Sequence, residues 1–167
     1  MVDFKSDLKQ GKHFENLVKL YLCGYDISNL KHISGVSNGY SVIDFFYKGI
    51  PYEVKSDFRA NTTGNCYIEL KSNKGISGLA KTYKAHPDCI LAYVVFLSLE
   101  PTHKSYEIHF MKLEDVMPIA EKCNLAPQKR DVNSTAYGAL IKIEDLKKHG
   151  VIYESRVINI MNPCQPG

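Results

Sequence analysis

The fold of this chain is decided in the stretch YSVIDFFYKGIPYEVK, residues 40–55. Its two halves, Tyr40–Tyr47 and Ile50–Lys55, are rich in β-branched and aromatic residues and are separated only by Lys48-Gly49. Glycine at the second position of a two-residue loop favours a tight turn, although lysine is a weaker first residue than asparagine or aspartate. The stretch therefore predicts a β-hairpin.

The register of this hairpin places three charged side chains on one face. Counting outward from the two-residue loop puts Asp44 directly opposite Glu53. Lys55 lies two positions beyond Glu53 and therefore on the same face. Two opposed carboxylates repel each other, but a divalent cation between them reverses the sign of the interaction, because Mg²⁺ binds one or two carboxylates together with water and phosphate oxygens. A lysine beside such a cation can polarise the attacking water or neutralise charge on a phosphorane.

The same three residues also have a plain structural interpretation. On a solvated face they would be ordinary surface charges, with Lys55 relieving the repulsion between the two acids. However, Val42 and Phe46 share the face with Asp44, so apolar neighbours flank this acid on its own strand. This pattern favours the functional interpretation.

Outside the hairpin, the pattern predicts a helix followed by strands and helices. Apolar residues between Phe14 and Leu22 recur at helical spacing and indicate an amphipathic helix from near Ser6 to just before Gly24. Further strands are expected at Asp26–Ile33, Asn65–Leu70, Cys89–Leu99, Tyr106–Met111 and Ala136–Ile143, and helices at Leu113–Cys123 and Glu144–His149. Loop is expected at Asn124–Thr135, loop or short helix at Lys71–Pro87, and a frayed tail at Asn162–Gly167. This order predicts a single α/β domain over residues 1–167, built on a central mixed β-sheet flanked by helices.

Composition indicates the broad class of protein but does not indicate a specific function. A chain of 167 residues with 44% hydrophobic and 23% charged residues suits one globular domain, and a net charge of +3 permits a polyanionic partner. The five cysteines form no C-x-x-C pair, which argues against a zinc knuckle or a disulfide framework, and no apolar run approaches membrane-spanning length. We therefore expect a cytoplasmic protein. The six histidines show no ligand spacing, and no P-loop, dinucleotide fingerprint or G-x-S-x-G elbow occurs.

The order of the charged residues resembles that of the PD-(D/E)XK nuclease superfamily. A helix bearing Glu15 precedes Asp44 and then Glu53-Val54-Lys55. Four further segments are similar to small phage-type members of that superfamily, namely Phe4–Gly11, Thr63–Glu69, Ser77–Leu79 and Ala85–Asp88. Ile43 stands where the family often has a proline before its first aspartate. The resemblance ends near residue 95.

The resemblance implies a role for each motif residue. Asp44 and Glu53 would bind Mg²⁺ or Mn²⁺, the backbone carbonyl of Val54 would complete the protein ligands, and Lys55 would serve the attacking water or the transition state. Glu15 would reach the metal site directly or through water, or it is a flanking surface charge. Glu69 would bind a second metal or orient water, or it is one of many half-exposed strand acids.

A stretch beside the expected metal site lacks acidic residues. Between Glu69 and Asp88 the only charged residues other than histidine are lysines. The candidates for binding the nucleic-acid backbone are Arg59, Lys71, Lys74, Lys81 and Lys84. Taken singly, each lysine is more simply a solvated surface residue, but together they suggest a groove that follows the phosphate backbone.

The resemblance implies a metal-dependent endonuclease of a phage or mobile element, acting in a bacterial or phage-infected cell. DNA is favoured over RNA by the resemblance alone. Three alternatives remain open: an RNA-cleaving toxin-type nuclease of the same fold, a non-cutting nucleic-acid-binding module, and an unrelated interaction domain if the hairpin register is wrong. A homodimer is compatible with cutting two strands of a duplex.

Overall fold

The hairpin around Lys48-Gly49 is present in the structure, a computed structural model that describes residues 4–35, 43–100 and 103–161. Strands β2 (Phe45–Tyr47) and β3 (Ile50–Asp57) pair antiparallel, with Tyr47 opposite Ile50. Lys48 and Gly49 have φ values of 50° and 79°. Positive φ at both loop positions is the conformation of a type I′ turn, whose twist matches that of the strands. The predicted turn is confirmed, whereas the first residues of the predicted strand, 40–42, lie outside the described residues.

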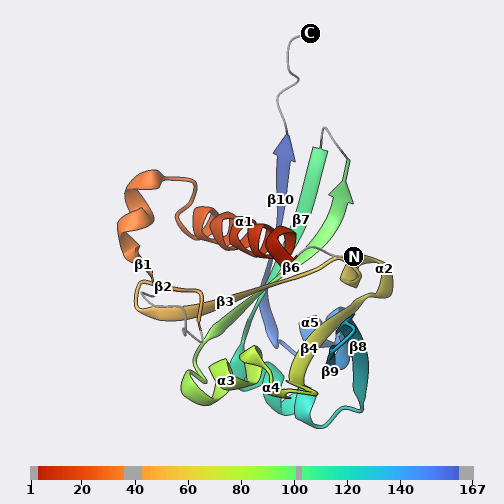
Figure 1. The fold of residues 1–167 in the computed structure, drawn as a ribbon. Helices are drawn as coiled ribbons and strands as arrows, with labels where there is room; N and C mark the ends of the chain where they lie inside the picture. Colours follow the sequence, from red (N-terminus) through yellow and green to blue (C-terminus); the bar gives the residue numbers. More distant parts are fainter. Residues whose placement is uncertain (1–3, 36–42, 101–102, 162–167) are drawn as a thin grey trace.

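A six-stranded mixed sheet is built around this hairpin (Figure 1). Its order is β1-β2-β3-β6-β7-β10, with β1 at Ile33–Gly35, β6 at Ile90–Leu99, β7 at His103–Lys112 and β10 at Ile152–Met161. β3 and β6 run parallel, and every other neighbouring pair is antiparallel. β6 is the near-continuous apolar run of the sequence, and its residues 90–96 are buried, as expected for a strand covered on both faces.

The strand that follows the hairpin in sequence belongs to a second sheet, which corrects the expectation of one central sheet. This four-stranded antiparallel sheet has the order β5-β4-β9-β8 and comprises β4 (Asn65–Ser72), β5 (Gly75–Ile76), β8 (Leu125–Asp131) and β9 (Ser134–Lys142). The physical reason lies in β3, whose two edges are already paired with β2 and β6. The chain turns away through α2 (Ala60–Thr63) before β4 begins.

The helices are close to those expected. α1 (Phe4–Leu22), α4 (Leu113–Glu121) and α5 (Ile143–Lys148) confirm three predicted helices, and α3 (Gly78–Ala85) is the short helix allowed for within Lys71–Pro87. Two predictions are wrong. Most of Asp26–Ile33 is a 3₁₀ helix, η1 (Ile27–His32), rather than a strand. The polar stretch Asn124–Thr135 is not a loop, because β8 and the start of β9 pair across it.

Two apolar cores lie on opposite faces of the large sheet. On one face α1 packs through Phe14 and Val18 against the sheet residues Phe45, Ala92 and Val94. The other core joins the alternate residues of β6 to the second sheet and α4 through Leu91, Tyr93, Val95, Ile68 and Met117. Together the two sheets and the helices form an α/β domain (Figure 1). Among the described residues, no helix is both long and apolar enough to cross a membrane.

Candidate active site

Glu53 and Lys55 occupy one face of β3 at the centre of the large sheet. In the parallel pairing with β6, Glu53 lies beside Leu91 and Lys55 beside Tyr93, which places both side chains on the face that looks toward the second sheet. Glu53 is only 7% exposed because β3 is an interior strand. The ammonium group of Lys55 donates a hydrogen bond to Oε1 of Glu53. The lysine therefore partly compensates a carboxylate that the fold has taken out of water.

Asp44 sits at a bend immediately before β2. Its backbone N–H donates to the Tyr52 carbonyl at 2.9 Å, which continues the hairpin ladder by one bond. Its Oδ2 accepts a hydrogen bond of 2.7 Å from the N–H of Val54. A regular hairpin count predicts that the Asp44 side chain projects from the sheet face. In the structure its carboxylate is instead bonded to the backbone of β3. The pairing of β2 with β3 ends at Phe45. Beyond that point the Asp44 carboxylate accepts the hydrogen bond of the Val54 N–H, which would otherwise lack a partner on β2.

The electrostatic environment shows that Asp44, Glu53 and Lys55 share one site. Burial, and secondarily the charge of Glu15, raises the pKa of Asp44, although the Val54 N–H and Lys55 oppose this. Burial and the charge of Asp44 raise the pKa of Glu53, although Lys55 opposes this. Burial lowers the pKa of Lys55, but Glu53, followed by Asp44 and Glu69, raises this pKa above its ordinary value. Two crowded acids with one lysine form a site that additional positive charge would stabilise.

Glu15 approaches this site from α1. Its charge contributes to the raised pKa of both Asp44 and Glu53. Its Oε2 is 2.7 Å from Nζ of Lys12 and 3.9 Å from Nζ of Lys19, the two lysines on the same face of the helix. Glu15 therefore lies near both predicted metal ligands, while its own carboxylate is already paired along the helix.

Glu69 reaches the same region from the second sheet. It lies on β4 and forms an ion pair with Arg130 of β8. Both residues line a cavity of about 690 Å³ to which β3 also contributes Val54 and Lys55. Among the other residues that line it are Gly11, Phe58, Arg59, Tyr67, Gln128 and Tyr93. The cavity thus lies between the two sheets, and Lys55 is the motif side chain exposed in it, whereas Asp44 and Glu53 are not part of its wall.

The predicted backbone-binding residues separate into two groups. Arg59 follows β3 and lines the cavity. Lys71 on β4, Lys74 in the turn after it, and Lys81 and Lys84 on α3 are exposed, and none of the four belongs to the cavity wall. Asp57, at the end of β3, has a structural role, because it accepts hydrogen bonds from the N–H groups that begin α2 and from the Tyr93 hydroxyl.

Two cavity residues, Gln128 and Arg130, were not found by sequence reasoning. Both lie on β8, an edge strand that contains Pro127 and no β-branched residue. Proline is tolerated on an edge strand but weakens any strand signal in the sequence. No pattern in the sequence links this segment to the hairpin, so only the pairing of β8 with β9 reveals its place at the cavity.

The donor atoms at the site suit a hard divalent cation. Asp44 and Glu53 offer carboxylate oxygens, which hard cations prefer. The backbone N–H of Val54 donates a hydrogen bond to the Asp44 carboxylate and fixes its position. In the part of the chain that the structure describes, no group of three or more His, Cys, Asp or Glu side chains is arranged to hold a metal ion. The two carboxylates are oxygen ligands of the kind that Mg²⁺ and Mn²⁺ bind together with water and phosphate oxygens.

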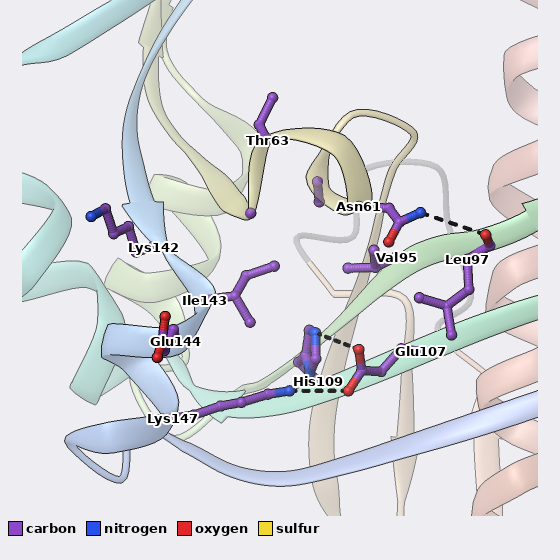
Figure 2. A pocket seen from close by; sticks show the side chains of 12 residues that line it. Asn61, Thr63, Val95, Leu97, Glu107, His109, Lys142, Ile143, Glu144 and Lys147 are labelled. Atoms are coloured by element: carbon purple, nitrogen blue, oxygen red, sulfur yellow. Dashed lines mark hydrogen bonds and ion pairs between the residues drawn. The ribbon is translucent and has the colours of Figure 1, made fainter.

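A second cavity lies elsewhere in the molecule, and none of the predicted site residues lines it. Its volume is about 500 Å³, and Figure 2 shows His109 and Glu107 of β7 beside Lys147 of α5. Nδ1 of His109 is 2.9 Å from Oγ of Ser155, whereas the buried Nε2 has no hydrogen-bond partner in the described structure and lies 3.6 Å from Glu107. Burial lowers the pKa of His109 to about 4, so this imidazole is neutral near pH 7.

Comparison with other proteins gives no match: no family model fits the chain, and no curated protein and no solved structure is significantly similar to it. The fold and the site together define an α/β domain with a buried Glu53, a half-buried Asp44 and one lysine beside a cavity. The resemblance to PD-(D/E)XK nucleases rests on the motif residues and the four similar segments of the sequence, and the nuclease function stays a prediction.

Proposed function

We propose that this chain is a divalent-metal-dependent phosphodiesterase that cuts nucleic acid, with DNA favoured over RNA through the resemblance to phage-type nucleases. The observation that carries the proposal is the cluster of Asp44, at the bend before β2, with Glu53 and Lys55 on the neighbouring strand β3. A buried Glu53 with a half-buried Asp44 beside it is costly for a fold that has no use for the pair. The cost is understandable if the pair binds a cation during function.

Asp44, Glu53 and the carbonyl of Val54 would hold Mg²⁺ or Mn²⁺, which supplies Lewis-acid stabilisation of the phosphoryl oxygens when bound. Lys55 has a different task. Paired with Glu53, it keeps its proton, so it acts as a fixed positive charge and hydrogen-bond donor rather than as a base. The strand holds this ammonium at the cavity, where it can stabilise the charge that develops on the phosphate in the transition state.

The cavity between the two sheets is where the scissile phosphate would approach Lys55. Arg59 and Arg130 line the same cavity and carry positive charges suited to the neighbouring phosphates. Glu69 holds Arg130 by an ion pair and adds a further acid near Lys55. The proposal assigns Glu69 to positioning Arg130, with a second metal or water site as the alternative role that the resemblance implies.

A cleavage panel tests the proposal. The purified chain is incubated with circular duplex DNA, linear duplex DNA, single-stranded DNA and RNA, each with Mg²⁺ and with EDTA. We expect Mg²⁺-dependent cleavage of at least one DNA substrate. Cleavage of RNA alone would move the assignment to a ribonuclease of the same fold. Binding without cleavage of any substrate would favour the non-cutting module, and cleavage in excess EDTA would refute the metal mechanism.

A further inference from the structure

An exposed aromatic ring stands three residues after Lys55, at the wall of the same cavity. Phe58 is 50% exposed, although it is one of the largest apolar side chains. One face of its ring is stacked on Phe96, with ring centroids 3.9 Å apart and an interplanar angle of 19°. Phe96 is only 6% exposed and is anchored in the core by edge contacts with Phe14 and Tyr106. Phe58 is therefore stacked on a rigid support and stays half-exposed among the described residues.

The groups around this ring match the parts of a nucleotide. Arg59 follows Phe58 directly and lines the cavity, and Arg130 enters it from the second sheet, held by Glu69. An aromatic face suits a base, since every base has a π surface that stacks on it. Guanidinium groups suit the phosphates on either side of a nucleotide. The volume of about 690 Å³ falls within the range of cavities that enclose a small molecule rather than a broad groove.

We propose that this cavity receives one unpaired nucleotide, whose base stacks on Phe58 while Arg59 and Arg130 bind the flanking phosphates. The proposal rests on the proposed function and adds the substrate class: nucleic acid whose strand is unpaired at the cleavage point. In a continuous duplex both faces of each base are covered by its neighbours, and only the edges are accessible in the grooves. A half-exposed aromatic ring at the wall of a concave cavity suits a base that has left the stack.

If Phe58 had a purely structural role, its substitutions would have different effects. If the ring served only to cover Phe96, any apolar side chain of similar size would replace it, because area burial does not depend on ring geometry. If the ring carries a base, a flat aromatic side chain is required. Phe58→Leu separates these roles, since leucine keeps an apolar contact with Phe96 but offers no π face. Phe58→Trp retains a flat face, and Tyr153→Ala removes a comparably exposed aromatic outside the cavity as the matched control.

The experiment compares these variants and Phe58→Ala on three substrates of one sequence: a full duplex, the same duplex with a single-nucleotide bulge, and the single strand. Single-turnover cleavage is measured with Mg²⁺, binding of the single strand is measured in EDTA, and a melting curve is recorded for each protein. We expect the wild type to cut the bulged or single-stranded substrate faster than the duplex. Phe58→Ala and Phe58→Leu should both weaken single-strand binding by roughly 5- to 150-fold, while Phe58→Trp and Tyr153→Ala stay near the wild type.

The inference is overturned if Phe58→Leu binds the single strand as tightly as the wild type, or if the wild type prefers the full duplex. Failure of the proposed function looks different, because then no substrate is cut with Mg²⁺. In that case the binding series in EDTA still decides whether Phe58 carries a base.

Discussion

The lysines proposed to act on the substrate differ in their surroundings, although the sequence alone does not distinguish them. Lys55 is tied to Glu53 beside the cavity, whereas Lys71, Lys74 and Lys81 are exposed and lie outside the cavity wall. In the proposed function, Lys55 acts on the reacting phosphate. The others can meet phosphates only along the backbone of a longer substrate.

Lys55→Ala should therefore lower the single-turnover rate by about 10²-fold or more while leaving substrate binding largely intact, because its charge acts mainly in the transition state. Neutralising Lys71, Lys74 and Lys81 together should instead weaken binding and reduce the slope of log affinity against log salt by about one unit or less per lost contact. Cleavage rates and titrations at several salt concentrations measure both effects. Normal cleavage by Lys55→Ala, together with an unchanged salt slope in the triple variant, would contradict both assignments.

Asp44 offers a test that links stability to function. Burial, and secondarily the charge of Glu15, raises its pKa, so the ionised form is unfavourable in the folded protein without a cation. Asp44→Asn keeps an oxygen for the Val54 N–H and removes the charge, and its melting temperature in EDTA should exceed that of the wild type. Mg²⁺ at about 100 times its dissociation constant should stabilise the wild type by about 2.7 kcal/mol and the variant far less. Equal stabilisation of both proteins would exclude Asp44 as a ligand.

At the scale of elements, the two hairpin strands could be predicted and the second sheet could not. The hairpin is local, and its turn residues, alternation and register are all contained in residues 45–55. The second sheet depends on pairing between β4 and β9, which are far apart in sequence and carry no matching local signal. The pair Glu53–Lys55 therefore followed from the sequence. The cavity wall formed by Gln128 and Arg130 did not.

Gly138 controls how closely β9 approaches β4. It lies opposite Glu69, and a Cβ at this position would be 2.6 Å from the Ile68 carbonyl oxygen and 3.0 Å from the Glu69 Cα. These are backbone atoms, so Gly138→Ala must push the strands apart. We expect a loss of stability of about 1–3 kcal/mol in urea unfolding, together with reduced cleavage. Gly11→Ala, where an added Cβ meets nothing within 4 Å, is the control and should be neutral or slightly stabilising. Equal stability of the two variants would contradict this packing.

His109 should make the protein sensitive to acid. Its pKa is lowered by burial to about 4 from 6.5, although Glu107 opposes the shift and Lys147 adds to it. Since the folded state favours the neutral imidazole, stability is complete above about pH 6.5 and is lost as the pH falls toward 4. Between pH 7 and pH 5 this residue should cost about 2 kcal/mol. Urea unfolding of the wild type and of His109→Gln at both pH values isolates the effect, because the carboxylates titrate in both proteins. The same pH dependence in both would show that His109 does not carry it.

In the whole molecule, the two sheets contribute different residues to the candidate site and its cavity. The large sheet holds the acids and Lys55 on its hairpin, and the small sheet supplies Glu69, Gln128 and Arg130 as the facing wall of the cavity. The proposed metal site and the facing cavity wall with Gln128 and Arg130 thus come from different parts of the chain. This division explains why the resemblance, which ends near residue 95, covers the proposed chemistry but not β8.

The central claim is that Asp44 and Glu53 support cleavage by holding a hard divalent cation, and a metal series on the best substrate tests it most directly. Single-turnover cleavage is measured for the wild type and Glu53→Gln with Mg²⁺, Mn²⁺, Ca²⁺ and EDTA, with Glu121→Gln as an exposed control. We expect cleavage by the wild type and the control with Mg²⁺ or Mn²⁺, binding with little turnover in Ca²⁺, and no cleavage in EDTA or by Glu53→Gln. Full activity of Glu53→Gln, or robust cleavage in excess EDTA, would contradict it.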